Sequence, residues 1–422
     1  MSQAARILAA LALGLLLGIA TAHQAWAPRA ADLVEPVGQL WLNGLRMTIV
    51  PLVVGLLVTA IAEGAEAARG SRVAGRSFAW MVAILWFSAI LGAVMVPMLL
   101  GLFPMPAEAA ASLKSALSSA KPVEAVPGFA DFLRSIVPAN AISAAANDQI
   151  LPLVVFAAAF AFALTRIPVE GRTQVVSLFR AIAEAMIVVV NWLLWLGPIG
   201  VFALAYTVGV RAGGGAFGAL LHYIAIVSSV GIVILVLAYP VAALGARLPL
   251  ARFAREVAPA QAVGFSTQSS LATLPAMLRA SERLGVPVAS SGVTLPLAVA
   301  LFRATGPGMN MGVVLYVAHW YGMTLSPATI AMGVVVAAIT TFSAISLPGQ
   351  VSFVTNTAPI ALAMNVPLEP LAILIAVENI PDLFRTVGNV TMDVAVAATV
   401  GRRGGFSGDD LTTEDRLLRE AP

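Results

Sequence analysis

Polar and charged side chains share one face of a helix expected near the C-terminal end of the chain. Residues 378–393 read "ENIPDLFRTVGNVTMD", and apolar runs flank them on both sides. At ~100° per residue, six of the polar residues fall within an arc of about 100° over four turns. Ionisable groups in a membrane helix are costly and face a bundle interior or a watery cavity, so this face predicts a binding site. The six residues are Glu378, Asp382, Arg385, Thr386, Asn389 and Asp393.

The residue types on this face suit an anion and a cation together. Arg385 offers a planar guanidinium whose geometry matches a carboxylate, and the carboxylate of Asp382 could pair with an ammonium group. Asp393 and the amide oxygen of Asn389 are hard oxygen ligands of the kind that a small cation prefers. In an alternative interpretation, Asp382 and Arg385 lie at i and i+3 and only pair with each other. That pair alone does not account for Thr386, Asn389 and Asp393 on the same face.

The elements that must position this face are membrane-spanning helices. The 422 residues are 59% hydrophobic and 11% charged, whereas soluble domains have about 45–50% apolar and about 25% charged residues. Several stretches reach the ~20 apolar residues that cross a bilayer core. The absence of cysteine excludes disulfides and thiolate metal sites. We therefore expect an all-α polytopic membrane protein without a soluble domain.

Arginine-rich loops predict how the chain is oriented. Apolar spans are expected at 5–22, 37–62, 77–102, 150–165, 176–209 and 217–245. The first one carries an "AWA" sequence that fits signal-peptide cleavage, but the many later spans favour a retained helix. Arginines follow alternate spans, which places both termini in the cytoplasm. Because this orientation also explains the net charge of +3, we expect no nucleic-acid partner.

Two polar breaks interrupt the apolar C-terminal third of the chain. They read "GFSTQSSLATLP" at 264–275 and "TTFSAISLPGQ" at 340–350. Broken hydrophobic segments at membrane depth leave backbone groups open and indicate a transporter's binding site. The loop charges predict that the first segment enters from the cytoplasm and the second from outside. Two interfacial loops would be the alternative.

Several segments resemble, in the same order, those of the dicarboxylate/amino acid:cation symporters, the family of glutamate transporters. The resemblance runs from about residue 37 to residue 402, and "DLFRTVGNVTMD" carries it most specifically. The other segments are "RMTIVPLVVGLLVTAI", "IVPANAISAAANDQILPLVVFA", "EAMIVVVNWLLWLGPIGVFAL" and "FSTQSSLATLP".

The resemblance implies eight transmembrane helices plus two re-entrant helical hairpins, in a homotrimer in the plasma (inner) membrane. Residues 1–422 would form a single integral membrane transporter domain. A scaffold or trimerisation part would comprise about 5–62 and 150–209, and a transport part about 77–102 and 217–402. Residues 403–422 would form a cytoplasmic tail.

The resemblance also assigns roles to residues. Arg385 would hold the substrate's distal carboxylate and Asp382 its amino group, while Asp393 would form a cation site with backbone oxygens of Asn389 and Ala298. Glu378 is a candidate proton carrier, or equally a structural carboxylate. The remaining substrate contacts would be Thr386, Asn389, Ser269 and Ser270 at the first hairpin tip, and Ser346, Leu347, Pro348 and Gly349 at the second.

Two departures from the family pattern concern the first hairpin and the seventh helix. Leu271 stands where a third serine is usual. Counted without gaps, the family's Asn-Met-Asp-Gly-Thr motif corresponds to Phe302–Gly306 in this chain. Ala304 stands in place of the motif's aspartate, and Arg303 precedes it. An alternative alignment that places the Asn-Met of the motif on Asn310–Met311 would need an inserted helical turn on each side. We expect Arg303 to replace at least one sodium ion near Asp393, although snorkelling to an interface is the alternative.

Together these features predict a secondary active transporter rather than an enzyme. It would be an elevator-type, cation-coupled symporter for acidic amino acids or C4-dicarboxylates, with Na⁺ or H⁺ as coupling ion and no other cofactor. An anion channel is one alternative, and an intramembrane hydrolase using Ser269 or Ser270 is another. The sequence shows no base for such a serine, and it leaves open whether the substrate carries an amino group.

Overall fold

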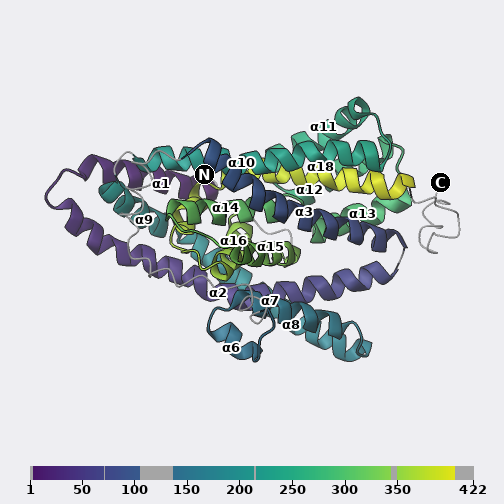
Figure 1. Cartoon of the computed structure of the whole chain (residues 1–422), viewed down its shortest axis with the longest axis horizontal. Helices are drawn as coiled ribbons and strands as arrows, with labels where there is room; N and C mark the ends of the chain where they lie inside the picture. The colour runs from purple at the N-terminus through teal and green to yellow at the C-terminus, as the bar shows by residue number, and fades with distance from the viewer. Residues whose placement is uncertain (1–2, 71, 105–135, 213–214, 344–348, 404–422) are drawn as a thin grey trace.

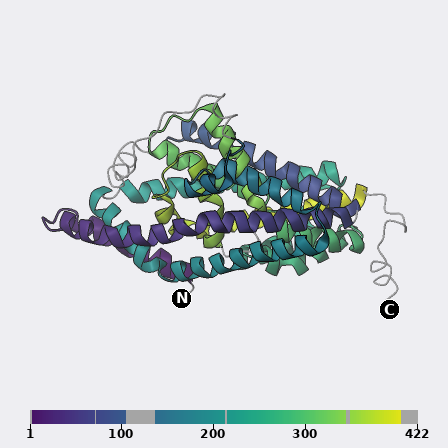
Figure 2. The ribbon, with the colours of Figure 1, turned by 90° about the horizontal axis from the view of Figure 1, so that it is seen from below.

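The described part of the chain is built from helices. A computed structural model describes residues 3–70, 72–104, 136–212, 215–343 and 349–403. All regular secondary structure within these ranges is helical, so the predicted all-α class is confirmed. The longest helices run side by side along the length of the molecule (Figures 1 and 2).

The first half of the chain contains the long α2 and a pair of helices that the sequence predicted as one span. The expected span at 176–209 is wrong: α8 ends and α9 begins on either side of Leu196. Pro198 explains the break, because proline lacks an N–H and cannot donate to the carbonyl of Leu194. The helices are α1 (Gln3–Thr21), α2 (Ala27–Gly70), α3 (Arg72–Leu102), α6 (Ala141–Ala146), α7 (Ile150–Leu164), α8 (Val169–Trp195), α9 (Gly197–Ala212), α10 (Gly215–Pro240) and the π-helical η1 (Val241–Gly245).

The second half contains shorter helices in helix–turn–helix pairs. α11 packs against α12, and α15 packs against α16. In Figure 1, α11, α12 and α13 gather toward the right-hand end of the molecule, and α14, α15 and α16 lie to the left of them. The helices are α11 (Leu250–Thr267), α12 (Ser270–Arg283), α13 (Val288–Leu301), α14 (Gly306–Trp320), α15 (Pro327–Thr340), the 3₁₀-helical η2 (Thr341–Ser343), α16 (Gly349–Ala363), α17 (Leu371–Val377) and α18 (Asn379–Arg403).

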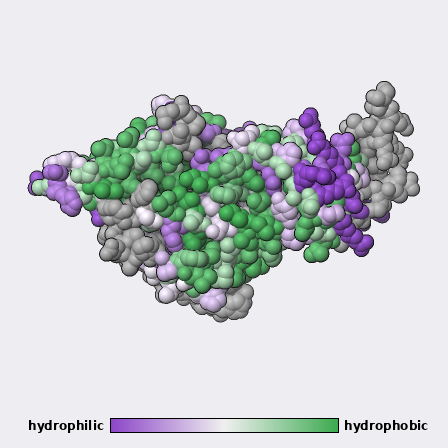
Figure 3. Space-filling view, turned by 90° about the horizontal axis from the view of Figure 1, so that it is seen from above, coloured by the Kyte–Doolittle hydropathy of each residue, from purple (hydrophilic) through white to green (hydrophobic). Residues whose placement is uncertain are grey.

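The outer surface of the molecule is strongly apolar. In Figure 3, hydrophobic side chains cover the middle of the visible face, and hydrophilic ones gather toward its two ends. Exposed side chains on this exterior include Leu40 at 74%, Met47 at 64% and Trp195 at 67%. Such large apolar surfaces fit contact with lipid. Five described helical segments are long and apolar enough to cross a membrane: Ala27–Glu63, Arg72–Leu102, Val169–Trp195, Gly218–Gly245 and Val288–Trp320.

The first helix is part of the packed fold. α1 lies along α9, and glycines on both helices bring the two backbones together. A Cβ at Gly14 would lie 2.6 Å from the carbonyl oxygen of Phe202, and one at Gly209 would lie 2.6 Å from that of Leu15. Small residues at such crossings let membrane helices approach closely. This packing agrees with the expectation of a retained first helix.

We predict that Gly14→Ala lowers the free energy of unfolding by about 1–3 kcal/mol, because the added methyl meets backbone that cannot yield easily. Gly292→Ala, inside α13, is the matched control, since a Cβ there meets nothing within 4 Å. Both variants gain the same helix propensity, so their difference isolates the packing. Melting of the purified proteins measures it, and equal melting temperatures would contradict the close approach.

Candidate functional site

Arg385 lies buried on the polar face of α18, and each guanidinium nitrogen has a protein partner. Nη2 donates to Oε1 of Glu378 at 2.5 Å, and Nη1 donates to Oδ1 of Asn310 at 2.9 Å. Nε lies 3.4 Å from Oδ1 of Asp382. The pairing of Asp382 with Arg385, which the sequence left as an alternative, is therefore present. The expected anion-binding group is held by two carboxylates and one amide.

Glu378 lies where α17 passes into α18. Pro381 lacks an N–H, so it cannot donate to the carbonyl of Val377, and the helix is interrupted there. The side chain of Glu378 is only 1% exposed. Besides its contact with Arg385, it accepts a hydrogen bond on Oε2 from the hydroxyl of Tyr223, on α10, at 3.3 Å. Glu378 thus joins α10 to the charged face of α18.

The interruption between α13 and α14 is fastened to the same face. Oδ1 of Asn389 accepts hydrogen bonds from the backbone N and from Oγ1 of Thr305, both at 2.9 Å. Oγ1 of Thr305 also lies 3.1 Å from the carbonyl oxygen of Arg385. Gly388 permits this approach, because a Cβ there would lie 2.5 Å from Cγ2 of Thr305. The amide oxygen that the sequence offered to a cation is occupied here by the broken helix.

The break falls on residues 302–305, the positions reached by the ungapped count, whereas Asn310 and Met311 lie inside α14. The start of α14 is also held by α3: the backbone N of Gly308 donates to Oγ of Ser88 at 3.1 Å. A Cβ at Gly308 would lie 2.7 Å from the carbonyl oxygen of Ser88, so glycine allows this contact. The first turn of α14 is thereby placed so that Asn310 reaches Arg385.

Asp393 lies one helical turn beyond Asn389 and is completely buried. Neither of its carboxylate oxygens has a hydrogen-bond partner among the described residues. The guanidinium of Arg303, in the α13–α14 break, is attracted electrostatically by Asp393 and by Asp382. The carbonyl oxygen of Ala298, at the end of α13, accepts a 2.8 Å hydrogen bond from the backbone N of Phe302. The residues predicted for a cation site therefore share this region with a fixed cation.

The first hairpin tip reaches the beginning of α18. Gln268 adopts left-handed backbone (φ 51°), and its Nε2 lies 3.4 Å from the carbonyl oxygen of Asn379. Ser269 caps α12 by accepting from the backbone N of Ala272 at 3.2 Å. Ser270 is the buried first residue of α12, and Leu271 is 55% exposed. The expected substrate contacts of Ser269 and Ser270 stay predictions.

The structure gives fewer contacts for the other predicted residues. Thr386 is 5% exposed on α18, and its methyl lies near Gly264 of α11. Gly349 begins α16, whereas Ser346, Leu347 and Pro348 lie outside the described residues. The expected lid at the second tip therefore stays a prediction.

The sequence did not identify several residues that hold the site together. Tyr223, Thr305 and Gly388 were not singled out, and Asn310 was considered only as part of another frame. Asn310 could have been noticed as a lone amide in the apolar run "MNMGVVLY". Tyr223 carries no such local signal, because its contact with Glu378 spans 155 positions of the chain.

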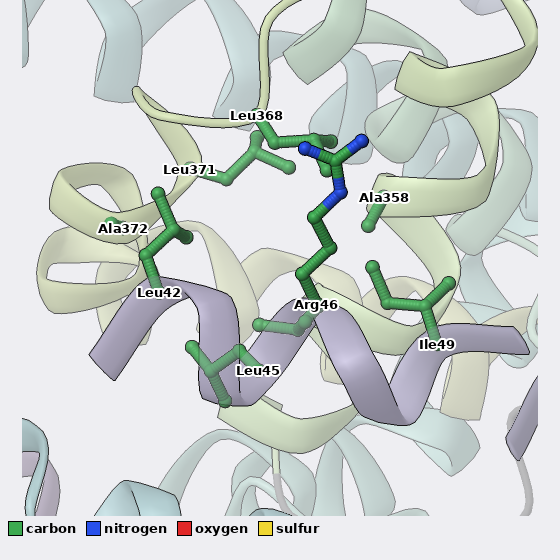
Figure 4. A pocket seen from close by; sticks show the side chains of 9 residues that line it. Leu42, Leu45, Arg46, Ile49, Ala358, Leu368, Leu371 and Ala372 are labelled. Carbon is green, nitrogen blue, oxygen red and sulfur yellow. The ribbon is translucent and has the colours of Figure 1, made fainter. Parts of the chain in front are cut away.

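A separate apolar pocket lies between α2 and the segments that form α16 and α17. Arg46 extends beside it, with the aliphatic side chains around its stem (Figure 4). Nη2 of Arg46 pairs with Oδ2 of Asp148 at 3.1 Å. The lining residues are Leu42, Leu45, Arg46, Ile49, Val354, Ala358, Leu368, Leu371 and Ala372. None of the charged residues around Arg385 belongs to this lining.

An interrupted helix, a hairpin tip and a buried charged face meet in a helical membrane protein, an arrangement typical of secondary transporters. The chain belongs to the sodium:dicarboxylate symporter family, whose sequence model matches residues 4–403. The predicted family is thus confirmed, as is the expectation of a cation-coupled membrane transporter rather than an enzyme.

Individual relatives cover nearly the whole chain. The proton/glutamate-aspartate symporter of Escherichia coli is 27% identical over 95% of this chain and 92% of its own length. The proton/sodium-glutamate symport protein of Bacillus subtilis is 26% identical over 96% of this chain and 93% of its own. C4-dicarboxylate transport protein 3 of Ralstonia nicotianae is 25% identical over 94% and 88%.

The contact between Gly388 and Thr305 can be tested with a double-mutant cycle. Gly388→Ala should destabilise the protein, because its methyl would overlap Cγ2 of Thr305. Thr305→Ser removes that methyl and keeps the hydroxyl, so the double variant should recover about 0.5–3 kcal/mol relative to additivity. Chemical denaturation in detergent measures the effect. Gly388→Ala combined with Thr207→Ser, a buried threonine on α9, is the control and should be additive; additivity in both pairs would contradict the contact.

Proposed function

We propose that the protein is a secondary active symporter that carries a small dicarboxylate or an acidic amino acid across the plasma (inner) membrane. The observation that supports this most directly is Arg385, a buried guanidinium on α18, the helix that also contacts the interrupted helix and the first hairpin tip. A guanidinium in a shielded site binds carboxylates in a fixed geometry. The relatives named above are symporters of glutamate and aspartate or carriers of C4-dicarboxylates.

Arg385 and Asp382 are proposed to divide substrate recognition between them. Arg385 receives the distal carboxylate, and Asp382 receives an amino group where the substrate has one. Thr386 and the serines of the first hairpin tip, Ser269 and Ser270, complete the wall of the site. The N-terminus of α12 presents backbone N–H groups at that tip, which favours the substrate's main carboxylate.

Transport is proposed to be of the elevator type, in a homotrimer with both termini cytoplasmic. Helix packing supports a division into two parts: α1 packs with α9, and α2 packs with α7, α8 and α9. α18 packs with α10, α11 and α13, and α14 packs with α3. These groups agree with a scaffold of about 5–62 and 150–209 and a transport part of about 77–102 and 217–402.

The coupling ion is proposed to be a proton, with Arg303 in place of a sodium ion. Asp393 is buried and attracted to Arg303, and a guanidinium remains charged throughout the accessible pH range. A sodium ion in the same region would meet fixed positive charge. Arg303 therefore acts as a tethered cation that balances Asp393.

Arg385→Lys tests the substrate contact while keeping a positive charge beside Glu378 and Asp382. An ammonium group lacks the planar fork, so losing one charge-assisted hydrogen bond should reduce dicarboxylate uptake about 10- to 100-fold. Uptake into proteoliposomes measures this. Arg211→Lys is the control, since Arg211 pairs with Asp32 and Glu35 away from the site. If Arg385→Lys takes up dicarboxylate as well as the wild type, the guanidinium is not required for substrate recognition.

Arg303→Gln tests the tethered cation. We expect the melting temperature of the wild type to be the same in sodium and choline chloride. Arg303→Gln leaves the carboxylate of Asp393 without this cation, so sodium should stabilise the variant by about 1–3 kcal/mol at saturating concentrations. Adding Asp393→Asn should abolish the sodium effect. Sodium-dependent stabilisation of the wild type would contradict the role of Arg303.

A further inference from the structure

Glu378 accepts a hydrogen bond from Nη2 of Arg385, a nitrogen that a bound substrate carboxylate would also use. A carboxylate that binds a guanidinium through two parallel hydrogen bonds uses either the Nη1/Nη2 edge or the Nε/Nη2 edge. Both edges include Nη2, the nitrogen that donates to Glu378 at 2.5 Å. Asn310 and Asp382 each occupy only one of the other two nitrogens. Nη2 carries two N–H groups, one on each edge, and Glu378 accepts from one of them. A substrate carboxylate that binds through two hydrogen bonds at the edge used by Glu378 therefore takes its place.

We propose that Glu378 stands in for the substrate's carboxylate on Arg385 and takes up one proton when the substrate displaces it. This rests on the proposed function, because it assumes that a carboxylate substrate binds Arg385. The substrate's carboxylate gains the hydrogen bonds of Nη2, and a proton from the water phase forms an O–H bond on the carboxylate of Glu378. At Arg385 one carboxylate charge arrives and one is neutralised by the bound proton, so the charge paired with the guanidinium is unchanged.

Within the described part of the chain, a displaced Glu378 has no cation beside it other than Arg385. The charged groups that act on it among the described residues are Arg385, which attracts it, and Asp382, which repels it. Its remaining hydrogen-bond partner is Tyr223, whose ring lies edge-on to that of Tyr316 at 5.3 Å. A buried carboxylate with one neutral donor and a negative neighbour favours its protonated form.

The other two carboxylates of the site differ from Glu378 in this respect. Asp382 and Asp393 are both attracted by Arg303, so each keeps a cation when Arg385 turns to the substrate. Asp382 also lies farther from Arg385, at 3.4 Å instead of 2.5 Å. The structure therefore assigns the exchanged proton to Glu378 rather than to either aspartate.

With this exchange, the carrier can be empty without leaving an unpaired guanidinium in the membrane. In the empty state Glu378 is ionised and neutralises Arg385. In the loaded state the substrate neutralises Arg385, and Glu378 is a neutral acid. Substrate without a proton, or a proton without substrate, leaves a buried charge unbalanced, which makes the two bind together.

Calorimetry of the full-length protein in detergent tests the exchange, with L-aspartate and succinate as probes. Titrations in buffers of different ionisation enthalpy give the number of protons taken up per ligand. We expect about one for the wild type, with Kd rising about tenfold for each unit of pH over the range where uptake occurs. Glu378→Gln should bind with no proton uptake and with a Kd that does not change over the same range.

Two variants serve as controls. Asp382→Asn should retain the uptake of one proton even if its affinity falls, and Glu369→Gln changes a partly exposed carboxylate outside the site and should behave as the wild type. Uptake lost in Asp382→Asn and retained in Glu378→Gln would overturn the assignment. An infrared difference spectrum of the wild type should show a protonated carboxyl band that appears with ligand. This measurement does not depend on the folding of any variant.

The outcomes separate the inference from the proposed function. Wild-type protein that binds neither probe contradicts the function as a carrier of these carboxylates. Wild-type protein that binds a probe without taking up a proton overturns the role of Glu378 and leaves the carrier function standing.

Discussion

The burial of the Arg385 guanidinium is the constraint on which the rest of the site depends. A charge that cannot reach water must be met by opposite charge and by hydrogen-bond acceptors at every donor edge. Here these acceptors come from α14, from α18 and from the α17–α18 junction, which is itself tied to α10. The arrangement of these helices follows from the need to surround one cation. A ligand that binds at an edge already in use must exchange with one of these partners.

The interrupted helix between α13 and α14 is stable for a related reason. Open backbone groups inside a membrane need partners, and Asn389 satisfies the N–H of Thr305 from the adjacent α18. That contact is close because position 388 carries no side chain. The polar residues of α18 therefore have two tasks: Arg385 and Asp382 face the proposed ligand, while Asn389 supports the backbone that positions Arg303.

The sequence predicted the features that depend on local periodicity. The polar face of α18, the all-α class and the first broken hairpin follow from residue spacing, and the structure places them as helices and a turn. The single span at 176–209 was wrong because length and hydropathy outweighed the local effect of Pro198. The contacts of Arg385 with Asn310 and of Glu378 with Tyr223 could not be predicted, since they join residues 75 and 155 positions apart. Long-range pairing of this kind depends on how helices pack, which a single sequence does not specify.

Arg303 has a thermodynamic consequence for the proposed cycle. A sodium ion is released on the far side of the membrane and carries the energy of its gradient with it. A guanidinium bonded to the chain travels out and back with the carrier, so it balances charge without contributing any gradient energy. Each diffusible ion replaced in this way lowers the highest accumulation that the carrier can sustain. It also frees transport from the supply of that ion, which suits a cell whose sodium gradient is small.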